Sequence, residues 1–412
     1  MIAKYWLLTG VLALLGAGAT SAFAQNPCGV YAPKVMDEIR HPHTDLTLLA
    51  AHRGVHALYD SNKYPNTPEN SLEAIRNAAN ECIEIIELDI RLTRDGVPIL
   101  SHDSTWGRET NVGNTYANEM YDPWKNTGPN PAINSWSLYS VKQDKGGILL
   151  RNSKNFGWSE WKEHPPTLKE AIDFIASSKI QIVLALDVKD SSALDAAWNV
   201  IARNGVYQTT FFKIDANGWA SPQTVNNYFR NRAYVCACIY ATDDQYVHIM
   251  PVYNTSNIGR DNSFGSEGGE AKVRRSVEAY IKGNWQWFMG VEINIKQSGG
   301  ILDQLHDEVA RSWIGSSGYP GALAIFNPRR EWVGADGSSL YFNSDGRCCS
   351  KLDAYWFNGS KDGLPSDTAD HRPDWKFIFD DEYFSLITSD NVTQLREELI
   401  AKKRRNVGRI RI

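Results

Sequence analysis

Short runs of apolar residues alternate along this chain with longer segments in which apolar residues recur every three or four positions. The short runs have the length of buried strands, and the longer segments have the period of amphipathic helices. The runs predict eight strands, over residues 46–52, 83–90, 181–188, 209–214, 234–240, 288–295, 322–326 and 383–388. Helices are predicted between many of them, over residues 69–80, 167–177, 191–204, 270–282, 301–311 and 392–403.

This alternation decides the expected architecture. Strands that alternate with helices form parallel sheets whose neighbouring strands are joined by helical crossovers. Eight such units predict an α/β fold of the TIM type, a (β/α)8 barrel. A doubly wound sheet is the alternative, but no Gly-x-Gly-x-x-Gly motif follows the first predicted strand.

Two segments do not follow the alternation. Residues 104–165 lack a strong period and contain five tryptophans, and residues 329–374 are rich in Gly, Asp and Ser. Long ordered loops of this kind often carry function. We expect both to be insertions on the C-terminal face of one barrel domain that covers residues 25–412.

The first 24 residues have the pattern of a signal peptide. Lys4 precedes an apolar stretch over residues 6–19, and Ala22-Phe23-Ala24 fits a cleavage site. The stretch is shorter than the roughly 20 residues that cross a membrane, so we expect no transmembrane segment after cleavage and a secreted or periplasmic location. Six cysteines lie beyond it and indicate disulfide bonds, whose pairing the sequence does not decide.

The composition narrows the classes of partner. Hydrophobic residues make up 42% of the chain and charged residues 22%, which is typical of a folded globular protein. A net charge of -5 argues against binding to nucleic acid, which needs a basic face. We expect a small-molecule substrate. The Trp-rich insertion and the basic residues 402–405 leave a peripheral membrane contact as a further hypothesis.

Residues with catalytic potential gather at the ends of the first two predicted strands. His52 and Arg53 end the first strand. Glu87 and Asp89 lie two residues apart on the second, so both side chains point to the same side. Two carboxylates on one face repel each other unless a cation lies between them, and oxygen ligands suit Mg²⁺ or Ca²⁺.

The sequence after the second strand predicts a hairpin. Asp95-Gly96 favours a two-residue turn, which places His102 opposite Asp89 and therefore next to the acidic pair. Parallel strands bring His52 to the same C-terminal edge. Two imidazoles can take and give protons on the two sides of a phosphodiester, while Arg53 and a metal ion neutralise the phosphoryl oxygens.

The third predicted strand of the barrel ends in a further acid and a lysine. Asp187 and Lys189 share a face, and we expect Asp187 to be a third metal ligand and Lys189 to contact the phosphate. A plain ion pair between the two is the alternative. Later strand ends add weaker candidates, namely Lys213, Asp215, Glu292 and Asn294.

The order of these motifs resembles that of glycerophosphodiester phosphodiesterases, whose superfamily includes phosphatidylinositol-specific phospholipases C and sphingomyelinases D. The motifs are His52-Arg53-Gly54, Pro68-Glu69-Asn70-Ser71, Ile86-Glu87-Leu88-Asp89 and residues 93–103. The resemblance implies a TIM barrel with a divalent Ca²⁺ or Mg²⁺ ion. It also implies His52 and His102 as the acid and base, Arg53 on the phosphate, and Glu87 and Asp89 as metal ligands.

The resemblance further implies that Glu69 orients the active site and contacts the substrate. The chain departs from the usual pattern in two places: glycerophosphodiesterases mostly carry Glu where this chain has Asp187, and the last strand ends in Thr-Ser-Asp. Asp at the first of these positions is similar to the sphingomyelinase D branch, so the departures bear on the substrate more than on the chemistry.

Together these features predict an exported, metal-dependent phosphodiesterase that hydrolyses glycerophosphodiesters to an alcohol and glycerol 3-phosphate. A phospholipase that acts on intact phospholipids, in the manner of sphingomyelinase D or phospholipase C, is the second enzymatic hypothesis. A catalytically silent protein that binds phosphodiesters or lipids is the third. The presence of both histidines, Arg53 and both acids of the second strand argues against the third.

Overall fold

A computed structural model describes most of the chain. The described residues are 28–57, 63–152, 162–189, 191–216, 218–232, 247–254, 269–283, 285–295, 301–314, 321–329, 332–333, 339–348, 350–351, 372, 378–379 and 383–412. The predicted signal peptide, the strand predicted over residues 234–240 and most of the second predicted insertion lie outside them.

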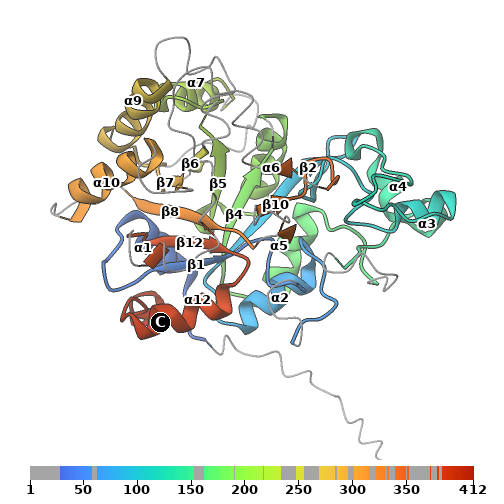
Figure 1. Ribbon diagram of the computed structural model, residues 1–412, viewed down its shortest axis with the longest axis horizontal. Coiled ribbons are helices and arrows are strands. Elements are labelled where there is room, and N and C mark those ends of the chain that lie inside the picture. The colour runs from blue at the N-terminus through green and yellow to red at the C-terminus, as the bar shows by residue number, and fades with distance from the viewer. Residues whose placement is uncertain are drawn as a thin grey trace, which may run out of the picture.

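Eight parallel strands form a closed barrel at the centre of the molecule (Figure 1). Their order around the barrel is β1-β12-β8-β7-β6-β5-β4-β2, and the pairing of β1 with β2 closes the ring. This confirms the predicted TIM barrel. The strands are β1 (Leu48–Ala51), β2 (Ile85–Leu92), β4 (Val183–Val188), β5 (Thr210–Asp215), β6 (His248–Asn254), β7 (Gly290–Asn294), β8 (Ala322–Asn327) and β12 (Leu386–Ser389).

Helices surround the barrel, and their apolar faces pack against the strands. The sequence sets where they begin: the Ser71 hydroxyl caps α2, and Thr167 forms a capping box with Glu170 at the start of α5. The helices of the barrel layer are α2 (Leu72–Asn80), α5 (Leu168–Ser177), α6 (Ser191–Arg203), α7 (Pro222–Arg232), α9 (Gly269–Lys282), α10 (Ile301–Ile314) and α12 (Val392–Ala401).

The strand β6 is one that the hydrophobic pattern did not predict. It begins with His248 and contains Pro251, which lacks a backbone N–H and normally argues against a central strand. In the barrel Pro251 nevertheless pairs in register with Ile214 of β5. The strand expected over residues 234–240 lies outside the described residues, and His248–Asn254 occupies the position between β5 and β7.

The hairpin after β2 differs from the prediction by one residue. Ile90 pairs with Leu100 of β3 (Pro98–Leu100), whereas a two-residue turn would pair Arg91 with Leu100. Thr93 donates its N–H to Val97 O at 3.1 Å, so the loop has three residues and ends on Gly96, whose φ is +75°. A left-handed glycine in this position is typical of three-residue hairpins. The predicted two-residue turn was wrong.

The N-terminal end of the barrel is covered by the two ends of the described chain. The helix α1 (Ala32–Arg40) packs on the first residues of the strands, beside the C-terminal segment that contains Ile410. A disulfide bond joins Cys28 to Cys82 with a Cα–Cα distance of 5.4 Å, in agreement with the predicted disulfide bonding.

The first insertion packs beside the barrel, at the right in Figure 1. It contains α3 (Val112–Ala117) and α4 (Leu138–Lys142), and it has a small core of its own around Trp106. The described part of the second insertion forms short antiparallel strands, β9 (Trp332–Val333), β10 (Ser339–Tyr341) and β11 (Ser350–Lys351). The two insertions touch, since Ser104 donates its N–H to Ser344 O at 2.6 Å. No helix among the described residues has the length and apolar character that a membrane crossing requires.

Candidate active site

A cavity of about 460 Å³ opens at the C-terminal end of the barrel. Residues that alternate along the strand ends point into it, as expected for the catalytic face of this fold. Six of the eight predicted site residues line it: His52, Arg53, Glu87, His102, Asp187 and Lys189. The other lining residues are Val188, Lys213, Asp215, Val252, Asn254, Glu292, Asn294, Phe326, Pro328, Arg329, Phe342, Arg372 and Asp390.

Three acidic side chains lie close enough together to hold a metal ion. One carboxylate oxygen each from Glu87, Asp89 and Asp187 lies within 4.8 Å of the others. The barrel produces this cluster directly, because β2 and β4 are neighbours and Asp89 pairs in register with Asp187. The donor set consists entirely of oxygen atoms, which suits a hard divalent cation such as Ca²⁺ or Mg²⁺.

The charge balance of this cluster fits a cation. Burial and the neighbouring Asp89 raise the pKa of Glu87 to about 7. Without a cation, the surroundings of the cluster do not keep all three carboxylates fully ionised. The Lys189 ammonium lies 2.7 Å from Asp89 Oδ1 and 2.6 Å from Asp187 Oδ2. The predicted ion pair is therefore present, and it shares two of the three acids with the candidate metal site.

His52 is fixed by an aspartate from the last strand of the barrel. Its Nδ1 lies 2.7 Å from Asp390 Oδ1, and its ring packs against Phe326 with 4.4 Å between the ring centroids. Its Nε2 is 4.0 Å from Glu87 Oε2. Burial opposes the charged imidazole, but Asp390 outweighs this effect and raises the pKa of His52 above its ordinary value.

His102 reaches the cavity although the hairpin register is not the predicted one. Ser101 takes the place opposite Asp89, with its N–H 3.1 Å from Asp89 O. The strand β3 ends at Leu100, so the chain is free to turn the His102 side chain back towards the cavity. Two guanidinium nitrogens of Arg91 fix the His102 carbonyl, at 3.1 and 2.9 Å.

His102 also has a carboxylate partner. Its Nδ1 lies 2.9 Å from Asp103 Oδ1. Burial and the Arg53 guanidinium lower the pKa of His102 to about 4. Both imidazoles therefore engage a carboxylate through Nδ1, and both rings line the cavity.

Arg53 lies in a strained backbone conformation at the end of β1. Its φ is +54°, which is uncommon for a residue with a side chain. Its N–H donates to Glu87 Oε2 at 3.0 Å, and its Nη1 donates to Glu69 Oε1 at 2.9 Å. Gly54 follows with a φ of +80°, and a Cβ there would lie 2.6 Å from Ala74 Cβ. The His-Arg-Gly motif thus packs tightly against α2.

Glu69 does not line the cavity. Its Oε1 accepts hydrogen bonds from Arg53 and from Arg108 Nη2 at 2.8 Å, and its Oε2 accepts one from Arg108 Nη1 at 3.3 Å. Burial opposes its ionisation, but Arg108 and Arg53 hold the pKa of Glu69 well below the usual range. The predicted orienting role fits this geometry, whereas a direct contact with substrate does not, because both oxygens face arginines.

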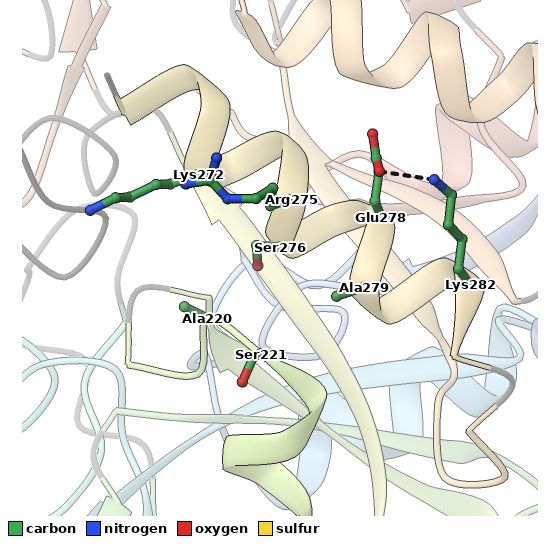
Figure 2. Close-up of a pocket in the computed structure, with 8 residues that line it drawn as sticks. All are labelled: Ala220, Ser221, Lys272, Arg275, Ser276, Glu278, Ala279 and Lys282. Atoms are coloured by element: carbon green, nitrogen blue, oxygen red, sulfur yellow. Dashed lines mark hydrogen bonds and ion pairs between the residues drawn. The ribbon is translucent and has the colours of Figure 1, made fainter. Parts of the chain in front are cut away.

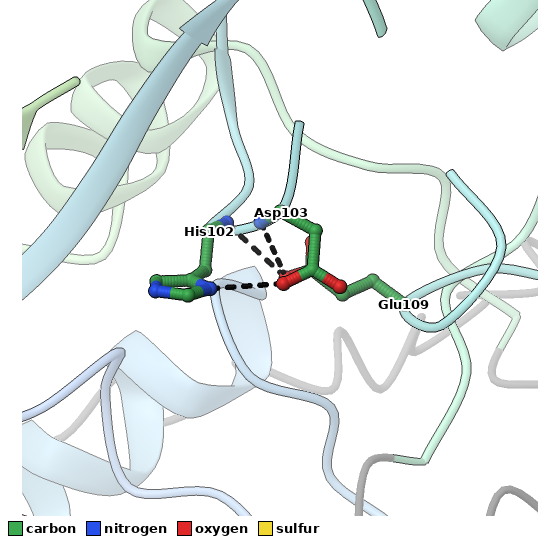
Figure 3. A group of neighbouring side chains, drawn as sticks. All are labelled: His102, Asp103 and Glu109. Carbon is green, nitrogen blue, oxygen red and sulfur yellow. Dashed lines mark hydrogen bonds and ion pairs between the residues drawn. The ribbon is translucent and has the colours of Figure 1, made fainter. Parts of the chain in front are cut away.

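A second group with metal-ligand spacing is formed by His102, Asp103 and Glu109 (Figure 3). Arg108 already neutralises its acids, since its Nε lies 2.6 Å from Asp103 Oδ2 and its Nη2 lies 2.8 Å from Glu109 Oε1. Glu109 Oε1 also accepts the N–H groups of His102 and Asp103, at 3.2 and 3.1 Å. These contacts make it a structural network rather than a metal site.

The wall of the cavity opposite the histidines is polar. The Lys213 ammonium lies 2.8 Å from Glu292 Oε2 across β5 and β7. Asn294 Nδ2 donates to Glu292 Oε1 at 3.0 Å and to Asn254 Oδ1 at 2.7 Å. The weaker candidates of the sequence, Lys213, Asp215, Glu292 and Asn294, therefore all reach the same cavity.

A second hollow, of about 570 Å³, lies at the surface between α9 and the start of α7 (Figure 2). Its described lining contains a single carboxylate, that of Glu278, which pairs with Lys282 at 2.9 Å. It brings together neither histidines nor a cluster of acids, so the chemistry belongs to the barrel cavity.

The family model for glycerophosphoryl diester phosphodiesterases matches residues 52–245, which begin at the first cavity histidine and include the acidic cluster and both imidazoles. This part of the chain belongs to that family. Mouse glycerophosphodiester phosphodiesterase 1 is 36% identical over 107 residues, which cover 26% of each protein. Glycerophosphodiester phosphodiesterase from Caldanaerobacter subterraneus is 29% identical over 148 residues, 36% of this chain and 47% of the relative.

These alignments span less than half the length of either relative. A crystal structure named for a glycerophosphoryl diester phosphodiesterase of Silicibacter pomeroyi has a TM-score of 0.51. It covers 90% of this chain and 99% of that chain at 13% identity. At that identity the likeness concerns the fold alone.

The residues that orient the histidines were not predicted from the sequence. Asp103 directly follows His102, and Asp390 directly follows β12, yet neither acid was predicted to have a role. The chain order contains a usable signal for each, because an acid at a strand end or beside a catalytic imidazole is a common orienting partner. Arg108 and the aromatic wall of Phe326 have no such signal in the sequence.

Proposed function

We propose that the protein hydrolyses glycerophosphodiesters to glycerol 3-phosphate and an alcohol, and that it does so as an exported, metal-dependent enzyme. One observation carries the proposal: two imidazoles, each engaged by its own carboxylate, share a cavity with an arginine and a three-acid cluster. The family assignment supports phosphodiester chemistry. The leader-like first 24 residues and the Cys28–Cys82 disulfide support export.

The residues of the site would have three separate roles, which are metal binding, phosphate binding and proton transfer. Glu87, Asp89 and Asp187 would hold the metal ion, which when bound supplies positive charge to the phosphoryl oxygens. The positively charged guanidinium of Arg53 would help to neutralise the same phosphoryl oxygens. One imidazole takes a proton from the attacking oxygen at its Nε2, and the other gives a proton from Nε2 to the leaving alcohol. The attacking oxygen belongs to water or to a neighbouring hydroxyl of the substrate.

The polar wall favours a small hydrophilic substrate. Lys213, Glu292 and the two amides of Asn254 and Asn294 line the cavity with hydrogen-bond donors and acceptors. Buried polar groups of this kind discriminate strongly against a ligand that cannot hydrogen-bond to them. They suit the hydroxyl groups of glycerol better than an acyl chain.

A second candidate is cleavage of an intact phospholipid, favoured by one observation. The Trp124 side chain is 44% exposed, and its ring centroid lies 5.3 Å from that of Phe342, which lines the cavity. An exposed aromatic side chain that packs on a cavity-lining residue is a feature that suits contact with a lipid surface. The polar interior of the cavity nevertheless suits a small diester better than an intact phospholipid.

A substrate panel separates these possibilities. We expect glycerol 3-phosphate release from glycerophosphocholine and glycerophosphoethanolamine, with little turnover of sphingomyelin or phosphatidylcholine vesicles. Prior dialysis against EDTA should stop the reaction, and Ca²⁺ or Mg²⁺ should restore it. Exclusive turnover of the vesicles would establish the lipid alternative, and full activity after chelation would exclude the metal. Inactivity on the whole panel with either metal would favour the silent binding protein.

A further inference from the structure

Arg108 occupies an unusual position at the start of the first insertion. Its side chain is 1% exposed and it contacts three carboxylates, those of Asp103, Glu69 and Glu109. It stands outside the cavity wall, so it does not meet the substrate directly. A buried guanidinium with this many charged partners is held in one orientation, because its planar donors fit the carboxylates in a fixed geometry.

The contacts of Arg108 form a continuous path between two residues of the cavity. On one side His102 Nδ1 bonds Asp103 Oδ1 at 2.9 Å, and Asp103 receives Arg108 Nε at 2.6 Å and Nη2 at 2.9 Å. On the other side Arg108 Nη2 bonds Glu69 Oε1 at 2.8 Å, and that same oxygen accepts Arg53 Nη1 at 2.9 Å. Arg108 is therefore the shared partner of the groups that orient His102 and Arg53.

A third contact joins this path to the second insertion. The Arg108 guanidinium carbon lies 5.2 Å from the centre of the Phe342 ring, which lines the cavity. The segment that carries Phe342 is held on the first insertion, where Asn130 Nδ2 donates to Asp345 O at 2.9 Å and Thr105 Oγ1 donates to Asp345 O at 2.7 Å. Arg108 thus contacts one wall of the cavity as well as both orienting acids.

We propose that Arg108 is a positioning residue that couples the orientation of the His102 imidazole to that of the Arg53 guanidinium. This inference rests on the proposed phosphodiesterase function. A proton-transferring imidazole and a phosphate-binding arginine must be correctly placed at the same moment. A displacement of about 1 Å in either one strongly lowers the rate of turnover. One guanidinium that bonds both supporting acids makes the two placements interdependent.

The test is R108K, which keeps the positive charge and removes the planar fork. A lysine ammonium can approach one of the two acids but cannot reproduce the paired contacts with both. We expect kcat on glycerophosphocholine to fall about 10- to 100-fold, the usual range for the loss of an outer partner of an active-site residue. The acidic limb of the pH profile of kcat/KM should move to higher pH. Asp103 that no longer accepts two bonds from the Arg108 guanidinium stabilises protonated His102 more strongly, which raises the pKa of His102.

Arg151 provides the matched control. It is also buried in the same insertion, but its Nη1 donates to two backbone carbonyls, those of Gly107 at 3.2 Å and Tyr121 at 2.9 Å. R151K should lower the unfolding temperature and leave the pH profile unchanged. If R108K lowers the unfolding temperature as R151K does but keeps the kcat and pH profile of the wild type, Arg108 is structural and the proposal is wrong.

A double-variant comparison tests the coupling itself. If Arg108 couples the two acids, the loss of kcat in R108K/D103N should be smaller than the product of the losses in R108K and D103N, whereas independent roles give losses that multiply. Should R108K fail to fold, D103N and E69Q replace it, and losses that multiply in D103N/E69Q would overturn the coupling. A wild-type enzyme without activity on any diester would refute the proposed function, which is a different outcome from an active wild type with an unaffected R108K.

Discussion

The strand β2 and the residue just before it present two buried glutamates to opposite ends of the barrel, and the two have very different surroundings. Glu84, at the N-terminal end, is satisfied: Arg405 donates two bonds to it at 2.7 and 2.6 Å, and Leu49 N–H adds a third at 2.6 Å. Glu87, at the C-terminal end, faces two other acids and receives the N–H of Arg53.

The difference separates structural charge from functional charge. A buried carboxylate with a dedicated arginine contributes to the fold and is costly to unpair. A buried carboxylate among like charges has a raised pKa, as Glu87 has, and such a group could take a cation as its counter-charge. The buried charge at the N-terminal end of this barrel is therefore paired within the fold, while the C-terminal end has an excess of acid, which suits the proposed chemistry.

The sharpest way to test this division is to remove the imidazoles of the C-terminal end. H52A or H102A should reduce glycerophosphodiester hydrolysis by about 10²- to 10⁴-fold, because general acid–base catalysis by a placed group contributes that much. The unfolding temperature should change little, since both side chains line a cavity. H41A, at an exposed histidine that pairs with Asp37, is the control and should keep full activity. An active H102A would remove the acid–base assignment.

One substitution at each glutamate compares the two ends of the barrel directly. E84Q leaves Arg405 without its buried counter-charge and should cost about 3–5 kcal/mol of unfolding free energy. E87Q relieves repulsion, so the metal-free protein should be as stable as the wild type or more so, while turnover is lost. Urea unfolding and initial rates measured on both variants decide the matter. If E87Q unfolds as readily as E84Q, the two ends do not differ as we infer.

The pH dependence of stability offers a test at the N-terminal end. Burial and the neighbouring Arg40 lower the pKa of His248 to about 4, because the folded protein excludes the charged imidazole. The unfolded chain takes up its proton near pH 6.5, so stability is lost as the pH falls from about 6.5 to about 4. The loss attributable to this residue is on the order of 3 kcal/mol. H248Q should flatten that part of the stability profile, and an unchanged slope would contradict the assignment.

The same comparison shows which features the sequence can predict. The barrel follows from the alternation of apolar runs and helical periods, and the acidic cluster follows from two-residue spacing on neighbouring parallel strands, because both depend on local periodicity. Strand β6 was missed because Pro251 weakens the local strand pattern and only the neighbouring strands compensate for it. The bond between Glu69 and Arg108 was missed because Arg108 lies 39 residues away in the chain.

The hairpin register is an intermediate case and provides the smallest expected effect. Asp95-Gly96 correctly predicted a turn, but its length depended on Thr93, whose hydroxyl donates to Asp95 Oδ1 at 2.6 Å and accepts the Val97 N–H at 3.0 Å. Gly96 has a φ of +75°, and a Cβ added there would meet nothing within 4 Å, so G96A adds backbone strain without a clash. We expect a loss of about 1 kcal/mol in unfolding free energy.

Activity should survive G96A, because the His102 backbone is held by Arg91 and Glu109 beyond the end of β3. The measurement is a urea unfolding curve together with kcat on glycerophosphocholine. A loss of turnover far beyond the loss of stability would mean that the turn itself sets the position of His102. The position of the His102 imidazole would then depend on the hairpin register, because a slip of one residue turns each side chain to the opposite face of the sheet. The network around Arg108 would no longer be sufficient to explain that position.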